Sequence, residues 1–188
     1  AASRYTEIVR AWPLDLVALR LAQSCHFFLG RMSGMRDLED TVRPHWNDAM
    51  PGHHAVLGMQ AFGFEETGDY AQAERTGRRA IELQPRDTWA WHAVAHVHEM
   101  RNAPKEGIAW LEPNVAHWSR DSFFAVHNWW HLALFHLGAG EIDVVLGLFD
   151  GPLYGKASGV VLDMVDASAL LWRLHLAGTD VGPRWNAV

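Results

Sequence analysis

The sequence contains a single cysteine, Cys25, among its 188 residues. One cysteine excludes an intramolecular disulfide and fits a reducing compartment, so we expect a cytoplasmic protein. No run of apolar residues is long enough to cross a membrane. The first residues also lack the hydrophobic region of a signal peptide. We therefore expect no membrane association.

Positive charge is scarce as well. The 16 Lys and Arg are outnumbered by 22 Asp and Glu, which gives a net charge of −6 and a pI near 6.0. This balance argues against a nucleic-acid partner. The sequence also has no phosphate-binding loop, dinucleotide fingerprint, serine nucleophile elbow or Cys–His pair. The sequence therefore gives no support for the enzyme classes that these motifs define.

Tryptophan and histidine are abundant, with 10 Trp and 12 His. Apolar residues recur with the spacing of helices, and the alternation typical of strands is almost absent. The pattern predicts an all-α protein in which Asp69, Asp87 and Asp121 cap helix N-termini. The expected helices cover residues 14–30, 34–43, 53–67, 70–84, 88–101, 105–111, 122–138, 141–149 and 159–177.

An internal repeat groups these helices into hairpins. The segment from His54 to Asp87 is 34 residues long and resembles a tetratricopeptide repeat (TPR), with Ala61, Ala73 and Ala80 at its small-residue positions. We expect one domain over 1–188, a right-handed α-solenoid whose first helices line a concave groove. Its hairpins would cover about 14–45, 53–85, 88–112 and 122–150, followed by the helix 159–177.

Several segments resemble one family more specifically. These segments are residues 62–67, 92–100, 127–131, 163–166 and 181–185, together with Arg173. With them, the chain resembles the central portion of the tetratricopeptide repeat protein 38 family, also called StaR-like. The resemblance implies a soluble, all-helical repeat protein but supplies no activity. Members are longer, so we expect a fragment that lacks flanking repeats or completes its stack as a homo-oligomer.

Two histidine pairs are the main functional signal. His92 and His96 are four residues apart in the expected helix 88–101, and His127 and His131 repeat this spacing in 122–138. Residues four apart lie one above the other on a helix, so each pair should occupy one stripe. Glu99 extends the first stripe. In repeat numbering, this first stripe faces the groove.

Further groove positions surround the two pairs. On the helix 53–67 they include Phe62, Glu65 and Glu66, of which Glu66 is our carboxylate candidate. Trp130 lies beside the second histidine pair. Asp163 and Asp166 are second-choice candidates, on one face of the last long helix, although Asp166 and Arg173 would also suit an ordinary ion pair. The predicted ligand groove is completed by the following residues: Phe62, Glu66, Trp130, Asp163 and Asp166.

This set of residues is compatible with several functions. It fits a groove that binds a peptide or small molecule, and it also fits buried imidazoles that only link helices. A third hypothesis is a divalent metal site for zinc, iron or manganese on the four paired histidines. A fourth is acid–base catalysis. A hydrolase- or oxygenase-type enzyme would draw on the following candidates: His92, His96, Glu99, His127 and His131.

Overall fold

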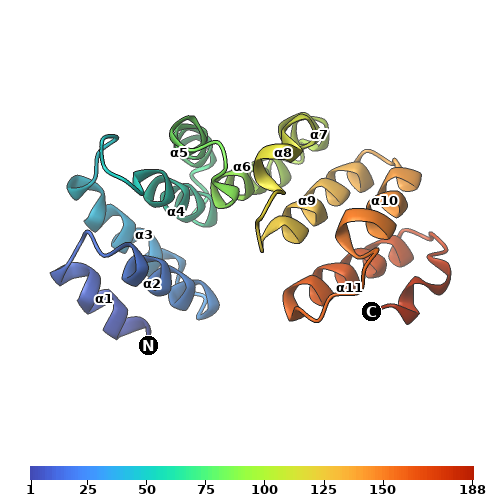
Figure 1. Ribbon diagram of the computed structural model, residues 1–188, viewed down its shortest axis with the longest axis horizontal. Coiled ribbons are helices and arrows are strands. Elements are labelled where there is room, and N and C mark those ends of the chain that lie inside the picture. Colours follow the sequence, from blue (N-terminus) through green and yellow to red (C-terminus); the bar gives the residue numbers. More distant parts are fainter. The chain divides into compact units, whose positions relative to one another are not determined.

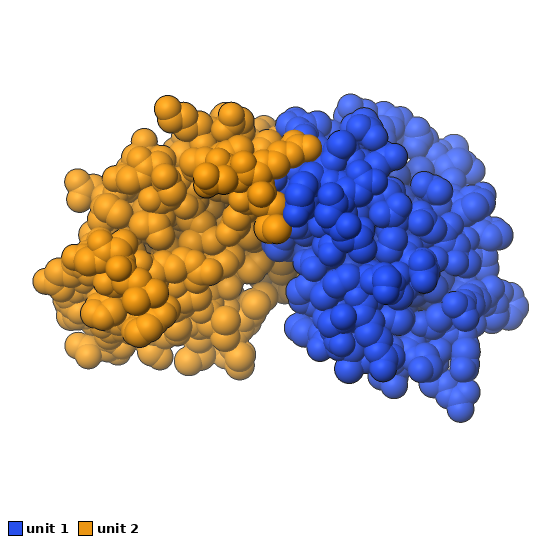
Figure 2. Space-filling model, turned by 180° about the vertical axis from the view of Figure 1, so that it is seen from behind, with its two compact units in different colours: residues 1–97 blue, residues 98–188 orange.

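The computed structural model describes residues 1–188 and contains helices and connecting turns. It divides into two compact units, Ala1–Val97 and His98–Val188 (Figure 2). Helix α6 (Thr88–Met100) begins in unit 1 and ends in unit 2. No helix is both long enough and apolar enough to pass through a bilayer.

Unit 1 consists of antiparallel neighbours along the chain (Figure 1). Helix α1 packs on α2, α2 on α3, α3 on α4 and α4 on α5. The bounds are α1 Ala2–Ala11, α2 Leu16–Phe28, α3 Met32–Val42, η1 Arg43–His45, α4 His53–Glu66 and α5 Tyr70–Leu83. The α4–α5 pair is the hairpin that the repeat spacing predicts.

Small residues allow α4 and α5 to approach each other. Ala61, Ala73 and Ala80 are each 0% exposed, as their repeat positions predict. Gly77 of α5 leaves room for α6 in the same way, because a Cβ at Gly77 would lie only 2.5 Å from Cγ2 of Val94 on α6. Gly63 leaves room for a different neighbour, since a Cβ there would collide with the buried carboxylate of Glu39 on α3.

Aspartate side chains cap the N-termini of several helices. Asp69 Oδ1 accepts a hydrogen bond from Gln72 N at 3.2 Å, and Asp87 Oδ1 accepts one from Ala90 N at 3.0 Å. These contacts confirm two of the predicted N-caps. The prediction for Asp121 is wrong. This residue has a left-handed φ of 53°, and α9 begins only at Ala125.

Unit 2 is built around α9, which packs against α7, α10 and α11. Its core is formed largely by α9, α10, η3 and α11, with Ala133, Phe149 and Leu171 among the buried residues. The bounds are α7 Pro104–Leu111, η2 Glu112–Asn114, α8 Val115–Trp118, α9 Ala125–Gly138, α10 Ile142–Leu148, η3 Phe149–Leu153, α11 Val161–Leu176 and η4 Gly182–Asn186.

Two prolines interrupt the regular hairpins of unit 2. Pro113 stands in η2, where α7 has already ended at Leu111. Pro152 lies in the π-helical turn η3, next to Gly151, whose backbone is not helical. Proline removes a backbone donor and disfavours a continuing α-helix. The chain therefore inserts η2, α8 and η3, none of which helical periodicity alone predicts.

Candidate histidine–carboxylate site

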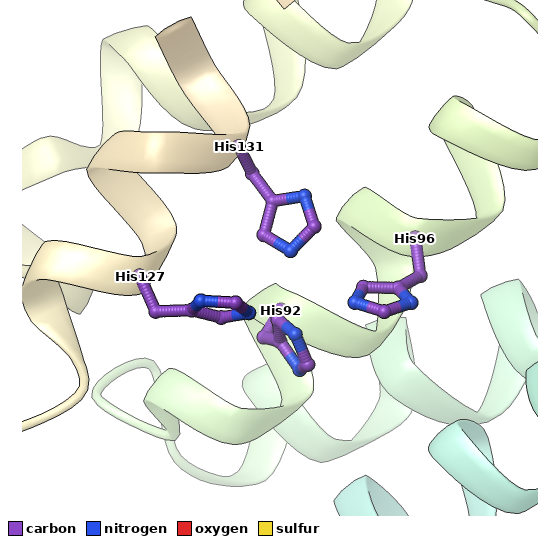
Figure 3. A group of neighbouring side chains, drawn as sticks. All are labelled: His92, His96, His127 and His131. Carbon is purple, nitrogen blue, oxygen red and sulfur yellow. The ribbon is translucent and has the colours of Figure 1, made fainter. Parts of the chain in front are cut away.

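In unit 1, the first histidine pair projects from α6 (Figure 3). His92 and His96 are one turn apart, and their ring centroids are separated by 4.2 Å at an interplanar angle of 71°. Both rings lie 5.6 Å from the ring of Phe62 on α4. Trp89 also contacts His92, with the centroids 5.0 Å apart. The pair therefore stands against an aromatic wall inside its own unit.

A carboxylate from α4 reaches the second histidine of this pair. Glu65 Oε2 lies 3.3 Å from His96 Nδ1. Glu65, Glu66 and His96 each offer a ligand atom, and these three atoms lie within 4.8 Å of one another. Burial raises the pKa of Glu66, with a further rise from neighbouring Glu65 and an opposing effect from His96.

The carboxylate that contacts His96 is that of Glu65, whereas the sequence analysis selected Glu66 as the candidate. The two glutamates follow Phe62 by three and four residues, so both belong to the same helix face. Glu65 is buried at 5% exposure, whereas Glu66 is half-buried. Helical periodicity places Glu65 and Glu66 on the same face, and only the packing of α4 shows that Glu65 is the one that contacts His96.

In unit 2, Glu99 at the end of α6 holds the buried ring of His131 on α9. The distance between His131 Nδ1 and Glu99 Oε2 is 2.9 Å. His131 is 2% exposed, whereas the Glu99 side chain remains 39% exposed. The contact thus joins a buried imidazole to a carboxylate that solvent reaches.

The second imidazole of unit 2 has an equivalent partner on α11. His127 Nδ1 lies 2.8 Å from Asp166 Oδ2, and Asp166 is buried. Arg173 instead places its guanidinium 5.3 Å from the centroid of a Trp130 ring. The candidate Asp163 is also buried on α11. Asp166 therefore joins the histidine pair, and the alternative of an Asp166–Arg173 ion pair is not the arrangement observed.

The rings of α9 pack closely on one another. His127 and His131 have centroids 4.8 Å apart in a T-shaped arrangement, and both rings project from α9 in Figure 3. Trp130 stacks on His127 at 5.4 Å and meets His131 edge-on at 5.0 Å. This packing restricts the rotation of both imidazoles.

Two of the four paired histidines, His127 and His131, therefore hydrogen-bond a carboxylate through Nδ1, whereas His96 Nδ1 lies 3.3 Å from Glu65 Oε2 without a hydrogen bond to it. A neutral imidazole that donates its Nδ1 proton to a carboxylate has its lone pair on Nε2. Such carboxylate partners commonly orient metal-binding histidines and catalytic acid–base histidines. The carboxylates thus favour the tautomer that either chemistry requires.

No protein-family model matches the chain, but solved structures define its fold. It is similar to the thermophilic TPR protein TTC0263 of Thermus thermophilus, with a TM-score of 0.68, 17% identity and coverage of 91% of this chain and 89% of that chain. A kinesin light chain protein of Podosopora anserina with nearly identical TPR-like repeats gives a TM-score of 0.56, 13% identity and coverage of 90% and 83%.

The protein MamA is also similar, with a TM-score of 0.56, 12% identity and coverage of 93% of this chain and 89% of that chain. At these identities the likeness concerns the fold. The protein is thus an all-α, TPR-like solenoid of helical hairpins. Repeat stacks of this kind typically present surfaces to protein partners.

Proposed function

We propose that this chain is a TPR-like binding module that takes a peptide or small molecule at a histidine–carboxylate site in each unit. The site of unit 1 comprises Phe62, Glu65, Glu66, His92 and His96. The site of unit 2 comprises Glu99, His127, Trp130, His131, Asp163 and Asp166. One observation carries the proposal. Histidine–carboxylate contacts connect α4 with α6, α6 with α9, and α9 with α11. These are the first helices of successive hairpins, the helices that line the groove in the TPR architecture.

At the family level, we propose membership of the tetratricopeptide repeat protein 38 (StaR-like) family. The segments 92–100 and 127–131, which carry that resemblance, also contain both histidine pairs. Part of the resemblance thus rests on residues of the proposed sites.

Burial and charge favour a particular kind of ligand. His92 and His131 are each 2% exposed, so a peptide main chain has little access to them. Glu66 and Glu99 are more accessible. Carboxylates equal imidazoles in number in the site of unit 1 and outnumber them in that of unit 2, so both sites favour a cationic group, such as an amine or a basic side chain.

A pair of fluorescent peptides tests this proposal. We expect a nonaarginine peptide to bind and a nonaglutamate peptide not to bind, as followed by fluorescence anisotropy. The double variant Glu66→Gln/Glu99→Gln should weaken binding by about three- to tenfold, because two solvent-accessible carboxylate charges are lost. The matched control is Glu82→Gln/Glu106→Gln, which removes two exposed carboxylates from the second helices α5 and α7. Equal losses in both double variants would refute the proposal.

A second candidate function is an acid–base or metal-dependent enzyme of hydrolase or oxygenase type. The observation in its favour is the pairing of His127 with Asp166 and of His131 with Glu99. With p-nitrophenyl acetate as a reporter ester, a hydrolase should lose at least about tenfold of its rate in His131→Ala. A wild-type rate equal to the buffer rate would exclude hydrolysis of this ester.

A further inference from the structure

We infer that unit 1 binds one zinc ion through Glu65 and Glu66 of α4 and His96 of α6. The inference rests on the proposed function, since it names a ligand of the unit 1 site. All three residues belong to the compact unit Ala1–Val97. Each offers one ligand atom, and the three atoms lie within 4.8 Å of one another. Imidazole nitrogen and carboxylate oxygen are common donors to zinc, so the set suits this ion.

The separation of His96 from Glu65 suits two ligands of a single ion. His96 Nδ1 and Glu65 Oε2 are 3.3 Å apart, and this oxygen accepts no hydrogen bond. Two ligands that bind zinc at about 2.0–2.1 Å with a tetrahedral angle between them lie about 3.3–3.4 Å from each other. In the octahedral shell of magnesium, neighbouring ligands at right angles would be only about 2.8–3.0 Å apart. The observed spacing therefore favours zinc.

The buried carboxylate of Glu65 lacks the hydrogen bonding that another carboxylate of unit 1 has. Asp87 Oδ2 lies 2.7 Å from His54 Nδ1, within hydrogen-bond distance, and its Oδ1 accepts from Ala90 N. Both Asp87 oxygens are thus satisfied. The Glu65 side chain is only 5% exposed, and its Oε2 is buried without a hydrogen-bond partner. Because a buried charge is costly unless it is paired or binds a metal, a cation at Oε2 would stabilise Glu65.

The surroundings of the three ligands combine apolar packing with access for an ion. The His96 ring meets the buried ring of Phe62 edge-on, with the centroids 5.6 Å apart. An apolar neighbour strengthens the attraction between a cation and its donors. Glu66 is half-buried, and the His96 side chain is 24% exposed. Solvent can therefore deliver the ion, and water can supply the fourth ligand that three-residue zinc sites commonly use.

Calorimetric titration of the chelator-treated protein with zinc tests the inference directly. We expect one equivalent to bind, and the melting temperature to rise when zinc is added. Glu65→Gln and His96→Gln should each weaken zinc binding by at least about 100-fold, because losing a group that only orients a ligand already costs about 10- to 100-fold. Glutamine keeps a polar side chain at each position, and circular dichroism will verify that both variants are folded.

His54→Gln is the matched control within unit 1. This histidine also faces a buried carboxylate from another segment, that of Asp87. It is not one of the three proposed ligands, so its loss should leave zinc affinity within about twofold. His131→Gln is the control in unit 2 and should likewise retain the ion. X-ray absorption of the bound zinc gives a second readout, in which we expect one imidazole, with nitrogen and oxygen donors at about 2.0–2.2 Å.

Three results would overturn the inference. The first is a folded wild-type protein that binds no zinc, and the second is zinc binding that Glu65→Gln and His96→Gln retain. The third is zinc bound by two or more imidazoles, or lost in His131→Gln, which would place the ion elsewhere. The arginine-peptide assay is run on the chelator-treated protein without zinc. Its failure would thus contradict the proposed binding function, whereas failure of the zinc titration alone would contradict only the inference.

Discussion

The histidine pairs of units 1 and 2 have the same helical spacing, yet different neighbours hold their rings. In unit 2, His127 and His131 each have a carboxylate within 2.9 Å of Nδ1. In unit 1, the contact of His96 with Glu65 is longer, at 3.3 Å, and His92 packs on Phe62 and Trp89. The four-residue spacing therefore brings the two rings of each pair together, whereas side chains from neighbouring helices determine which groups each ring contacts.

Two buried carboxylates, Glu39 of unit 1 and Asp166 of unit 2, differ in their partners. Glu39 of unit 1 accepts a hydrogen bond from Gln23 Nε2 at 2.8 Å, but its Oε2 is buried without a hydrogen-bond partner. In unit 2, the buried Asp166 pairs with the imidazole of His127. No hydrogen bond offsets the cost of burying a charged Glu39 at Oε2, whereas His127 offsets a similar cost for Asp166.

The largest expected effect concerns the close packing of α3 on α4 in unit 1. Gly63→Ala should lower the free energy of unfolding by about 3 kcal/mol, because the new methyl group collides with the buried Glu39 carboxylate. Urea unfolding measures this loss. Gly147→Ala in α10 of unit 2 is the control, since a Cβ there meets nothing within 4 Å. That variant should be neutral or more stable by up to about 1 kcal/mol. Similar losses in both variants would contradict the packing described here.

A smaller effect should separate the carboxylate partners of the two pairs. Asp166→Asn should lower the free energy of unfolding by about 2 kcal/mol, since the charge that accepts from His127 is lost. Glu65→Gln should cost less than about 1 kcal/mol, because its contact with His96 is longer. Urea unfolding of both variants makes the comparison. If Glu65→Gln proves the more destabilising, the order of the two units is reversed.

The smallest effect is a dependence of stability on pH in unit 1. Burial raises the pKa of Glu39 well above its usual value, and the hydrogen bond from Gln23 only partly opposes this. The native state then holds a proton that the unfolded chain has released, so stability falls as pH rises above about 4.5, the ordinary glutamate pKa.

Glu39→Gln removes this titration while an amide oxygen can still accept from Gln23. We expect the variant to match the wild type near pH 4 and to exceed it by about 1 kcal/mol at pH 8. Chemical unfolding at the two pH values provides the measurement. A difference between the two proteins that does not change with pH would show that Glu39 is not the titrating group.

Much of the fold follows from the sequence because local signals agree with packing. The expected helix 53–67 is α4 at His53–Glu66, and 70–84 is α5 at Tyr70–Leu83. The predicted helix bounds agree less well with the structure where an unusual backbone conformation or a proline ends a helix. The helix expected from 122 starts at Ala125 because Asp121 adopts a left-handed conformation, and the predicted end of 141–149 lies in η3, beside Pro152.

The candidate site is harder to predict for a different reason. The spacing of His92 and His96 places two imidazoles on one stripe, because helical geometry is local. The contact of His127 with Asp166 spans 39 residues and depends on how α9 meets α11. The choice of Glu65 over Glu66 likewise depends on the packing of α4 against α6. The sequence alone therefore identifies most of the candidate residues but not which of them contact one another.

The central claim, that carboxylates orient the paired imidazoles of unit 2, is tested most directly by nitrogen-15 NMR of the histidine side chains. We expect His127 and His131 each to carry a proton on Nδ1, which donates to Asp166 and Glu99 respectively. A proton on Nε2 and none on Nδ1 of either ring would contradict the account.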